Sequence, residues 1–364
     1  MVHNILYYIV KEILERTLIR MLICCVIALL FCITGNAKVP YIPKIINYSV
    51  SDYKAGNQNW AVAQGPGGKT YIGNNRGLLA FDGIHWDLVK LPNNLGVRAL
   101  YISKEGRIYV GSFEEFGYFE VDDENDLIYH SLSSSEINVY LNNDEFWTIN
   151  EYKGEIYFQS LGSFFIYDGE KVRKGVSDLP PLYIFTLDDH LYVQFMEGGS
   201  FCRMDDGQFT ELLSKKVLED DVVSVLPFDH QLLLVSARSG CFIYDEVRKK
   251  LSVWNTPANE ILKEGIANRG VMMKDSTFIV GTISNGVVAI NKQGETLWHI
   301  NRENGLINNT VLRVFADNSD NLWVTLDNGI AQIHVNSPIY FYEPLEAQIG
   351  MVHDMVIEKD IIYL

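Results

Sequence analysis

The amino-acid sequence predicts an all-β protein, a seven-bladed β-propeller of four-stranded antiparallel blades with an N-terminal signal segment. Two observations lead to this prediction. A unit of short apolar runs separated by polar turns recurs along the 364 residues at intervals of about 35 to 48 residues, the range expected of propeller blades. In each copy the second run is nearly continuously apolar, which indicates a strand covered on both faces.

The unit occurs in seven complete copies and one incomplete copy. The copies begin at Asn59, Val97, Phe146, Leu182, Val222, Arg269 and Gly305, and the incomplete copy at Val352. Their second runs read TYIG, RIYVG, EIYFQ, HLYVQ, QLLLVS, TFIVG and NLWVT. Burying one large apolar side chain contributes about 1.5–3 kcal/mol, so a single unit cannot offset its own ordering entropy. The units are therefore expected to stack into a ring.

Turns and polar runs complete each unit. Asp-Gly pairs, as in FDG, YDG and DDG, suit tight hairpins that need a positive φ. A more polar fourth run follows, for example HWDLVKL or QFTELL. Four strands repeated radially form a propeller. The tryptophans that recur at strand positions are expected in the core, namely Trp86, Trp147, Trp254, Trp298 and Trp323.

Closure of the ring can also be predicted. Residues 42–49 (IPKIINYS) resemble residues 337–344 (SPIYFYEP), since each segment carries Pro, then Ile, then Tyr. We expect residues 45–49 to supply the outer strand of the blade built from the seventh copy. The propeller then spans residues 41–344, and residues 345–364 begin a second, truncated propeller. The alternative is an eight-bladed ring built from all copies.

The N-terminus predicts export. An apolar run at residues 21–33 follows Arg16 and Arg20, and Gly35 and Ala37 occupy the small-residue positions of a cleavage site. A membrane span needs about 20 apolar residues, so this run fits a signal peptide at residues 1–37 better. The alternative is an uncleaved signal anchor.

Charge and cysteine content exclude several classes of function and of site. The formal net charge of −16 repels phosphate backbones, so this part of the protein is not expected to bind nucleic acid. Cys202 and Cys241, outside the signal segment, do not form a disulfide framework and are expected to pack as small apolar residues. The sequence predicts no cofactor and no metal site, because no Cys/His spacing suggests zinc.

Catalytic motifs do not emerge. The sequence contains no GxSxG, HExxH or phosphate-binding loop. His190 and His230 occupy equivalent first turns of adjacent copies, which explains them without a metal. The DNSDN stretch at residues 317–321 lacks the residue order of a calcium loop. We therefore expect no catalytic residues.

The seventh copy carries a family resemblance. ENGLINNTVLRVFADNSDNLWVTLDNGIAQI resembles the two-component regulator propeller repeat, whose pattern is Gly-Leu-x-Asn-Asn-x-Val, then Asp-x-x-Gly-x-Leu-Trp-x-Gly-Thr, then Gly-Leu. The matching residues are Gly305, Leu306, Asn308, Asn309, Val311, Asp317, Leu322, Trp323, Thr325 and Gly329. Asp320 replaces the turn glycine of the pattern, and no glycine separates Val324 from Thr325. The match is weaker in the other copies.

That resemblance implies the periplasmic sensor region of a bacterial membrane regulator. Family members typically carry two such propellers, a Tyr-rich β-sandwich, one membrane helix and a cytoplasmic output. The output is a histidine kinase with a response-regulator module or a helix-turn-helix region. Many members sense carbohydrates, especially oligosaccharides. The chain is then an N-terminal sensing fragment of a protein anchored in the inner membrane, whose partners are a small-molecule or oligosaccharide ligand, its own downstream domains and a second receptor copy.

Candidate ligand-binding residues lie in the loops between second and third strands and at the starts of first strands, where Arg98 and Arg269 are expected to point toward the central channel. Arg forks and aromatic faces suit sugar hydroxyls and carboxylates. The candidates are Arg76, Arg98, Glu114, Glu115, Arg238, Arg269, Asn285 and Asp327. The alternative is that they are solvated turn residues. Phe113 and Phe116 flank the glutamate pair and mark either a binding surface or blade packing.

Two classes of function remain. The first is a non-catalytic periplasmic sensor propeller. The second is a secreted propeller enzyme acting on glycans, a lyase or a hydrolase, or an interaction scaffold. The repeat signature favours the sensor.

Overall fold

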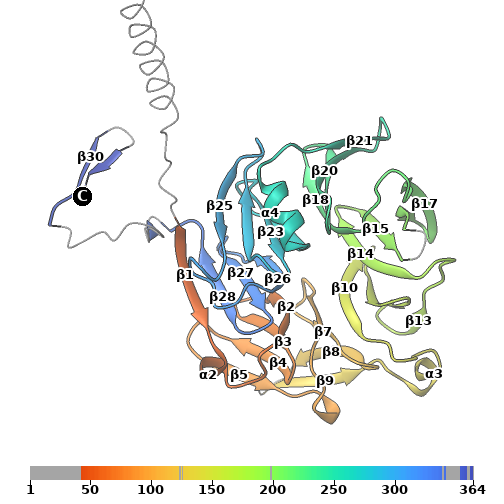
Figure 1. The fold of residues 1–364 in the computed structure, drawn as a ribbon. Coiled ribbons are helices and arrows are strands. Elements are labelled where there is room, and N and C mark those ends of the chain that lie inside the picture. The colour runs from red at the N-terminus through yellow and green to blue at the C-terminus, as the bar shows by residue number, and fades with distance from the viewer. Residues whose placement is uncertain are drawn as a thin grey trace, which may run out of the picture. The chain divides into compact units, whose positions relative to one another are not determined.

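Seven antiparallel sheets follow one another around a central axis and confirm the predicted seven-bladed β-propeller (Figure 1). The structure is a computed structural model that describes residues 42–122, 124, 126–196, 199–337, 340–341, 353–358 and 361–363. It separates residues 1–40 from residues 41–364, and only the second unit is described here. The predicted signal segment lies outside the described residues.

The first three blades each consist of four consecutive strands. The first blade comprises β2 (Asn59–Gln64), β3 (Thr70–Asn74), β4 (Gly77–Phe81) and β5 (Trp86–Val89). The second comprises β6 (Ala99–Ile102), β7 (Ile108–Gly111), β8 (Phe116–Val121) and β9 (Leu127–Ser131). The third comprises β10 (Phe146–Tyr152), β11 (Glu155–Ser160), β12 (Phe164–Tyr167) and β13 (Val172–Lys174).

The next three blades repeat this order. The fourth comprises β14 (Pro181–Leu187), β15 (His190–Phe195), β16 (Phe201–Asp205) and β17 (Gln208–Leu213). The fifth comprises β18 (Val222–Phe228), β19 (Gln231–Ser236), β20 (Gly240–Asp245) and β21 (Lys250–Val253). The sixth comprises β22 (Ala267–Met272), β23 (Phe278–Thr282), β24 (Val287–Ile290) and β25 (Thr296–Ile300).

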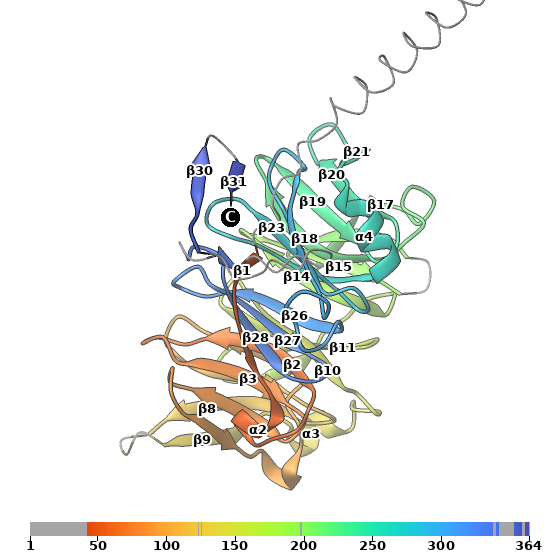
Figure 2. The same cartoon turned by 60° about the vertical axis from the view of Figure 1, so that its left-hand side comes forward.

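The seventh blade joins the two ends of the ring. Its inner strands are β26 (Val311–Ala316), β27 (Leu322–Leu326) and β28 (Ile330–His334). Its fourth strand is β1 (Ile42–Tyr48), which pairs antiparallel with β28 from Lys44 opposite His334 to Tyr48 opposite Ile330. Figure 2 shows β1 beside β28. The strand begins and ends slightly earlier than residues 45–49, because pairing extends through the IPK segment.

Three described strands follow the seventh copy. The short strand β29 (Tyr340–Phe341) pairs with the outer edge of β1, so that the seventh sheet has five strands. Strands β30 (Val356–Glu358) and β31 (Ile361–Tyr363) form a separate two-stranded sheet. That the incomplete eighth copy opens a second propeller stays a prediction.

Short helices occupy the connections. They are α2 (Val50–Tyr53), the 3-10 helix η1 (Pro92–Asn94), α3 (Ser135–Asn138) and α4 (Ala258–Gly265). The longest, α4, precedes the sixth blade and inserts the fully buried Leu262 into the core between the fifth and sixth blades.

The core lies between the blades, as the apolar second strands predict. Every residue of β3, β7, β23 and β27 is buried. Trp323, 2% exposed, packs with Ile72 and Leu79 across the junction of the seventh and first blades. Outer strands such as β5, β13 and β21 are largely accessible to solvent. Each sheet is therefore covered by its neighbours rather than by a helix layer.

Candidate functional site

An irregularity in strand pairing sets the geometry of the ring centre. The register between first and second strands shifts by one residue at the same place in six blades. The residue after the shift is therefore equivalent from blade to blade, and Ala99 stands at this position in the second blade, where it pairs with Gly111. The seven equivalent residues are Ala61, Ala99, Thr148, Tyr183, Ser224, Arg269 and Arg313.

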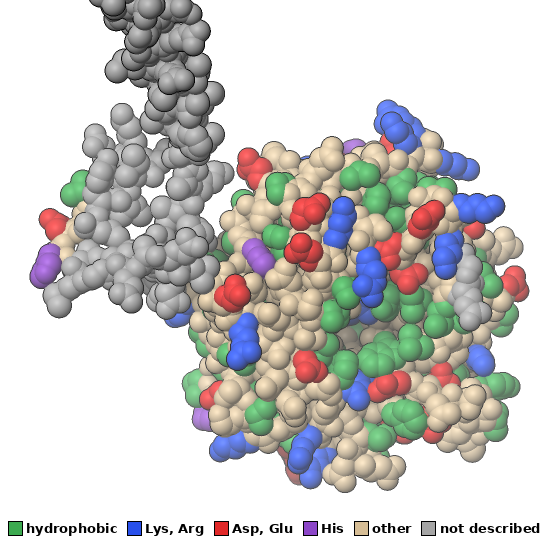
Figure 3. All heavy atoms as spheres, in the orientation of Figure 1, with side chains coloured by type: hydrophobic (Ala, Val, Ile, Leu, Met, Phe, Trp, Pro, Cys, Tyr) green, Lys and Arg blue, Asp and Glu red, His purple; other side chains and the backbone are tan. Residues whose placement is uncertain are grey.

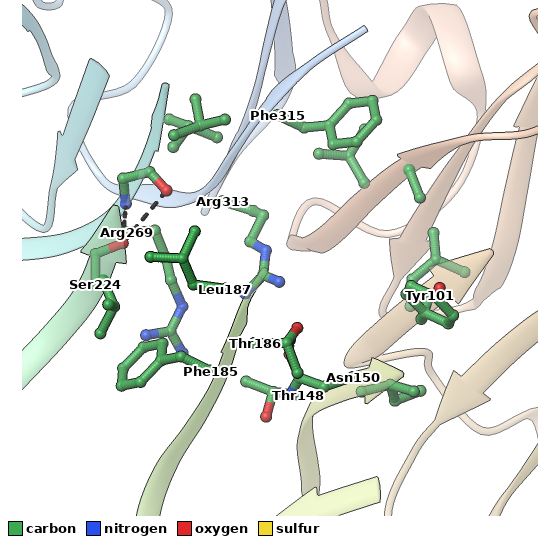
Figure 4. Close-up of a pocket in the computed structure, with 18 of the residues that line it drawn as sticks. Tyr101, Thr148, Asn150, Phe185, Thr186, Leu187, Ser224, Arg269, Arg313 and Phe315 are labelled. Carbon is green, nitrogen blue, oxygen red and sulfur yellow. Dashed lines mark hydrogen bonds between the residues drawn. The ribbon is translucent and has the colours of Figure 1, made fainter. Parts of the chain in front are cut away.

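The first strands of all seven blades line a central cavity of about 430 Å³. A space-filling view shows a hollow at the ring centre (Figure 3). Arg269 and Arg313 reach into the cavity from neighbouring strands, with Phe185, Leu187 and Phe315 close by (Figure 4). Among the described residues that line it, none is acidic. The cavity therefore carries a local positive charge in a protein of net charge −16.

Arg269 is held against the wall of the cavity. Its Nη1 donates to the carbonyls of Val223 at 3.2 Å and Asn268 at 3.3 Å. Its guanidinium carbon lies 4.4 Å from the ring centroid of Tyr183, within cation–π distance. The sequence prediction that Arg269 faces the channel agrees with this placement.

Arg313 shares the cavity but has no comparable anchors. No hydrogen-bond or ion-pair partner of its side chain occurs among the described residues. Burial and the charge of Arg269 lower the pKa of Arg313 to about 9, and burial also lowers the pKa of Arg269. Both side chains touch channel solvent yet are enclosed by protein on their flanks. At neutral pH both guanidinium groups are charged.

This propeller can be compared with known proteins. No protein-family model and no curated protein matches the sequence. Among solved structures, the extracellular domain of the hybrid two-component system BT4673 from B. thetaiotaomicron aligns with a TM-score of 0.65 at 18% identity, covering 81% of this chain and 40% of that one. The corresponding domain of BT3049 aligns with a TM-score of 0.58 at 14% identity, covering 81% and 42%. The fold is therefore shared with the extracellular domains of these two systems.

The propeller also aligns with an enzyme. Virginiamycin B lyase from Staphylococcus aureus aligns with a TM-score of 0.62 at 12% identity, covering 79% of this chain and 98% of that one. Similarity at these identities establishes the fold alone. The chain spans 40% of the BT4673 domain's length, so what that whole domain does cannot be transferred directly.

Arg98 does not line the cavity, contrary to the prediction that it points into the channel. Its guanidinium lies 4.3 Å from the Trp60 ring centroid and 6.0 Å from that of Trp147. Its Nε donates to Glu145 at 2.6 Å and its Nη1 to Asn75. These partners draw the side chain into a cluster that links the first three blades, which explains the difference.

The loops between second and third strands do lie beside the loops between blades. Backbone hydrogen bonds join them, from Val97 to Asn74 at 2.9 Å, Gly286 to Asn309 at 3.0 Å and Asp327 to Thr310 at 3.1 Å. Six candidates occur on this rim, spread over five blades: Arg76, Glu114, Glu115, Arg238, Asn285 and Asp327. The structure therefore places them along a rim and does not gather them at one point.

Several rim candidates already have protein partners. Glu115 accepts hydrogen bonds from Tyr129 and Ser131, both at 2.7 Å. Glu114 accepts from the Asn143 backbone at 2.8 Å, and Asp327 accepts from Gln58 at 2.6 Å. Such contacts show how these carboxylates order their loops.

The side chains of Arg76 and Arg238 are exposed on the rim. Asn285 contributes its backbone carbonyl to His299 at 2.7 Å. Of the flanking aromatics, Phe113 is 44% exposed, whereas Phe116 is fully buried at the start of β8. The rim thus offers arginines and one exposed ring, and Phe116 belongs to blade packing.

The side chains that were considered as metal ligands do not come together in the structure. His190 begins β15 and its ring stacks on Tyr192, while His230 is exposed in the following blade. Within the described ranges no three His, Cys, Asp or Glu side chains come together as metal ligands. Asp317 accepts the backbone N–H groups of Ser319 and Asn321 at 2.9 and 2.8 Å, which closes the turn.

Arg313 is the residue that sequence reasoning missed. It lies in TVLRVFA, where it reads as the polar side of an ordinary strand. A signal was available, because Arg269 and Arg313 fall at the same place in the sixth and seventh copies, each before a Gly/Val-containing apolar run. Aligning the copies residue by residue would have paired them.

Proposed function

We propose that this chain is the ligand-sensing propeller of a membrane-bound bacterial regulator. It is exported to the periplasm and binds a carbohydrate or another small ligand without transforming it. The signal passes to a cytoplasmic output on the same polypeptide, a histidine kinase or a helix-turn-helix region. A second copy of the full receptor is a further partner.

The observation that carries this proposal is the combination of fold and repeat. The propeller aligns with extracellular domains of two hybrid two-component systems, and the seventh copy resembles the repeat of such regulators. Those domains are longer than this chain, which agrees with a sensor region built from more than one module. Among the described residues no helix has the length and apolar character needed to cross a membrane. We assign the anchor to other parts of the polypeptide.

The geometry of the channel supports the binding of a small molecule. The channel cavity is lined by both polar and apolar side chains, a combination typical of small-molecule sites. The rim loops add the exposed arginines Arg76 and Arg238. Loops and first-strand residues can vary without disturbing the buried second strands, so the scaffold separates recognition from stability.

Ligand screening tests the proposal. The purified chain is heated with a panel of neutral and acidic oligosaccharides, and each mixture is then analysed for products. A ligand that binds the folded state raises the melting temperature in a saturable manner. Recovery of the ligand unchanged supports a sensor. The absence of any stabilising saccharide would contradict carbohydrate sensing.

An enzymatic propeller is the second candidate, favoured by the alignment with virginiamycin B lyase over 98% of that enzyme's length. The product analysis separates the two functions. Catalytic turnover of any stabilising ligand by the purified chain would replace the sensor proposal with a glycan lyase or hydrolase.

A further inference from the structure

We propose that the channel binds a small-molecule oxyanion, a carboxylate, phosphate or sulfate group, between the guanidinium groups of Arg269 and Arg313 (Figure 4). The inference rests on the proposed sensory function and adds to it the chemical class of the ligand. The two arginines stand at equivalent positions of neighbouring first strands, directly after the register shift in β22 and β26.

Arg313 has hydrogen-bond donors that the described part of the protein does not itself use. A guanidinium carries five N–H donors in a planar fork that matches an oxyanion. The Arg313 side chain has no protein partner among the described residues. Arg269 is fixed by two carbonyls and the Tyr183 ring, so that it is pre-organised without a carboxylate. The fixed guanidinium of Arg269 and the unpaired guanidinium of Arg313 would form a clamp, holding an anion from two sides.

The two guanidinium groups also lack a counter-charge in the described cavity wall. Two guanidinium groups enclosed together repel each other and lose solvation, and the lowered pKa values of both residues reflect this cost. None of the described cavity-lining residues is acidic, so the wall supplies no counter-charge. An anion between the two groups would offset both penalties at once.

Other polar groups in the cavity already form hydrogen bonds within the protein. Ser224 Oγ accepts from the Gly270 backbone at 3.0 Å, and Thr148 donates to Gln159 at 2.7 Å. Asn150 donates to the Ile184 carbonyl at 3.0 Å. The protein therefore satisfies its neutral polar groups and leaves the arginines as the recognition groups.

The overall charge of the chain does not oppose this site. A net charge of −16 repels anions at long range, but surface charges are screened beyond about 10 Å at 0.1 M salt. The arginines act at contact distance inside the channel. A cavity of about 430 Å³ is within the range of small-molecule sites, so a sugar acid is a suitable probe.

Thermal denaturation with matched ligands tests the inference. The purified chain is titrated at constant ionic strength with galacturonate, galactose, inorganic phosphate and sulfate. Galacturonate and galactose share a ring and differ in the carboxylate. We expect a saturable rise in melting temperature with galacturonate and none with galactose. Stabilisation by phosphate or sulfate in place of galacturonate would support the anion site with an inorganic source.

Three variants assign the effect to the clamp. Loss of a charge-assisted hydrogen-bonding partner in Arg313→Gln or Arg269→Gln should weaken oxyanion binding by at least about tenfold. Arg248→Gln is the control, because its side chain is 78% exposed on an outer hairpin. Without ligand, Arg313→Gln should melt at the same or a higher temperature, since it removes a repulsive charge.

The possible results separate this inference from the sensory proposal. If none of the three oxyanions binds in an Arg313-dependent manner, the inference fails. Galactose binding that persists in Arg313→Gln would overturn the oxyanion site and leave carbohydrate sensing intact. A large drop in the ligand-free melting temperature of Arg313→Gln, without any oxyanion effect on the unmodified chain, would make Arg313 a structural residue.

Discussion

Arg98 shows how a single side chain connects three blades. Its guanidinium faces the rings of Trp60 and Trp147 and pairs with Glu145, and the two ion-paired side chains are 23% and 29% exposed. Because these contacts are partly desolvated, they are stronger than those of an exposed pair. We expect Arg98→Ala to lower the free energy of unfolding by about 1–3 kcal/mol. Urea unfolding followed by tryptophan fluorescence measures this change.

Arg248 provides the matched control for Arg98. It also pairs with a carboxylate, that of Asp245 at 2.9 Å, but its own side chain is 78% exposed. Arg248→Ala should change the free energy of unfolding by less than about 1 kcal/mol. Arg98→Lys, which keeps the charge but loses the planar face, should fall between the two. Equal losses for Arg98→Ala and Arg248→Ala would contradict the role assigned to the two tryptophan rings.

Residue positions could be predicted only in part. Arg269 could be placed at the channel because it begins a first strand, whereas the sequence alone does not decide between a binding surface and blade packing for Phe116. Arg98 could not be placed, because its position depends on Trp60 and Glu145 from two other blades. Arg313 could not be found from its own strand, since a register shift of one residue decides which side chain faces the cavity. Such tertiary contacts have no signal in a local pattern.

At the scale of elements, prediction was more successful because burial follows local pattern. The second strands are apolar throughout and are covered on both faces, as in β3 and β27. The pairing of β1 with β28 could be proposed because residues 42–49 resemble a fourth strand. The exact bounds of β1 could not be predicted, because backbone pairing continues wherever neighbouring strands permit it.

The seam between β1 and β28 contains a pH-sensitive histidine, His334. His334 lies opposite Lys44, and its Nε2 is buried without a hydrogen-bond partner in the part of the chain that the structure describes. Burial and the Lys44 charge lower the pKa of His334, against the opposing effect of Asp317. The folded state therefore keeps His334 neutral while the unfolded state takes up a proton near pH 6.5. Stability should fall as the pH drops below about 6.5 toward the folded-state pKa.

Unfolding at pH 7.5 and pH 5.5 tests this expectation. His334→Gln should lose less stability between the two pH values than the unmodified chain, because the variant has no proton to take up at this seam. The exposed His230 gives the control, and His230→Gln should keep the full pH dependence. An unchanged pH dependence in His334→Gln would show that other groups cause the acid sensitivity.

At the scale of the whole molecule, closure of the ring determines cooperativity. Tyr48, at the end of β1, contacts the rings of Phe81, Trp86 and Trp323 with centroids 5.4, 5.2 and 6.1 Å apart. Asn47 donates to the Gly305 carbonyl at 2.8 Å. The contacts of Tyr48 with Phe81 and Trp86 join the first and seventh blades, and the Asn47 hydrogen bond ties β1 to the connection that precedes β26. Without them the first and seventh blades keep only their direct packing, as where Trp323 meets Ile72 and Leu79, and the outer edge of β28 is left unpaired.

We therefore expect a chain of residues 41–364 to unfold in one calorimetric transition, and a chain of residues 49–364 to unfold in several at lower temperature. Tyr48→Ala should reduce the free energy of unfolding by about 2–4 kcal/mol, because it removes a ring packed against three others. Tyr140→Ala, at a ring 52% exposed, should cost less than about 1 kcal/mol. Comparison of calorimetric and van't Hoff enthalpies measures cooperativity. A single transition of unchanged midpoint in the 49–364 chain would mean that the seven blades hold together through their lateral packing alone.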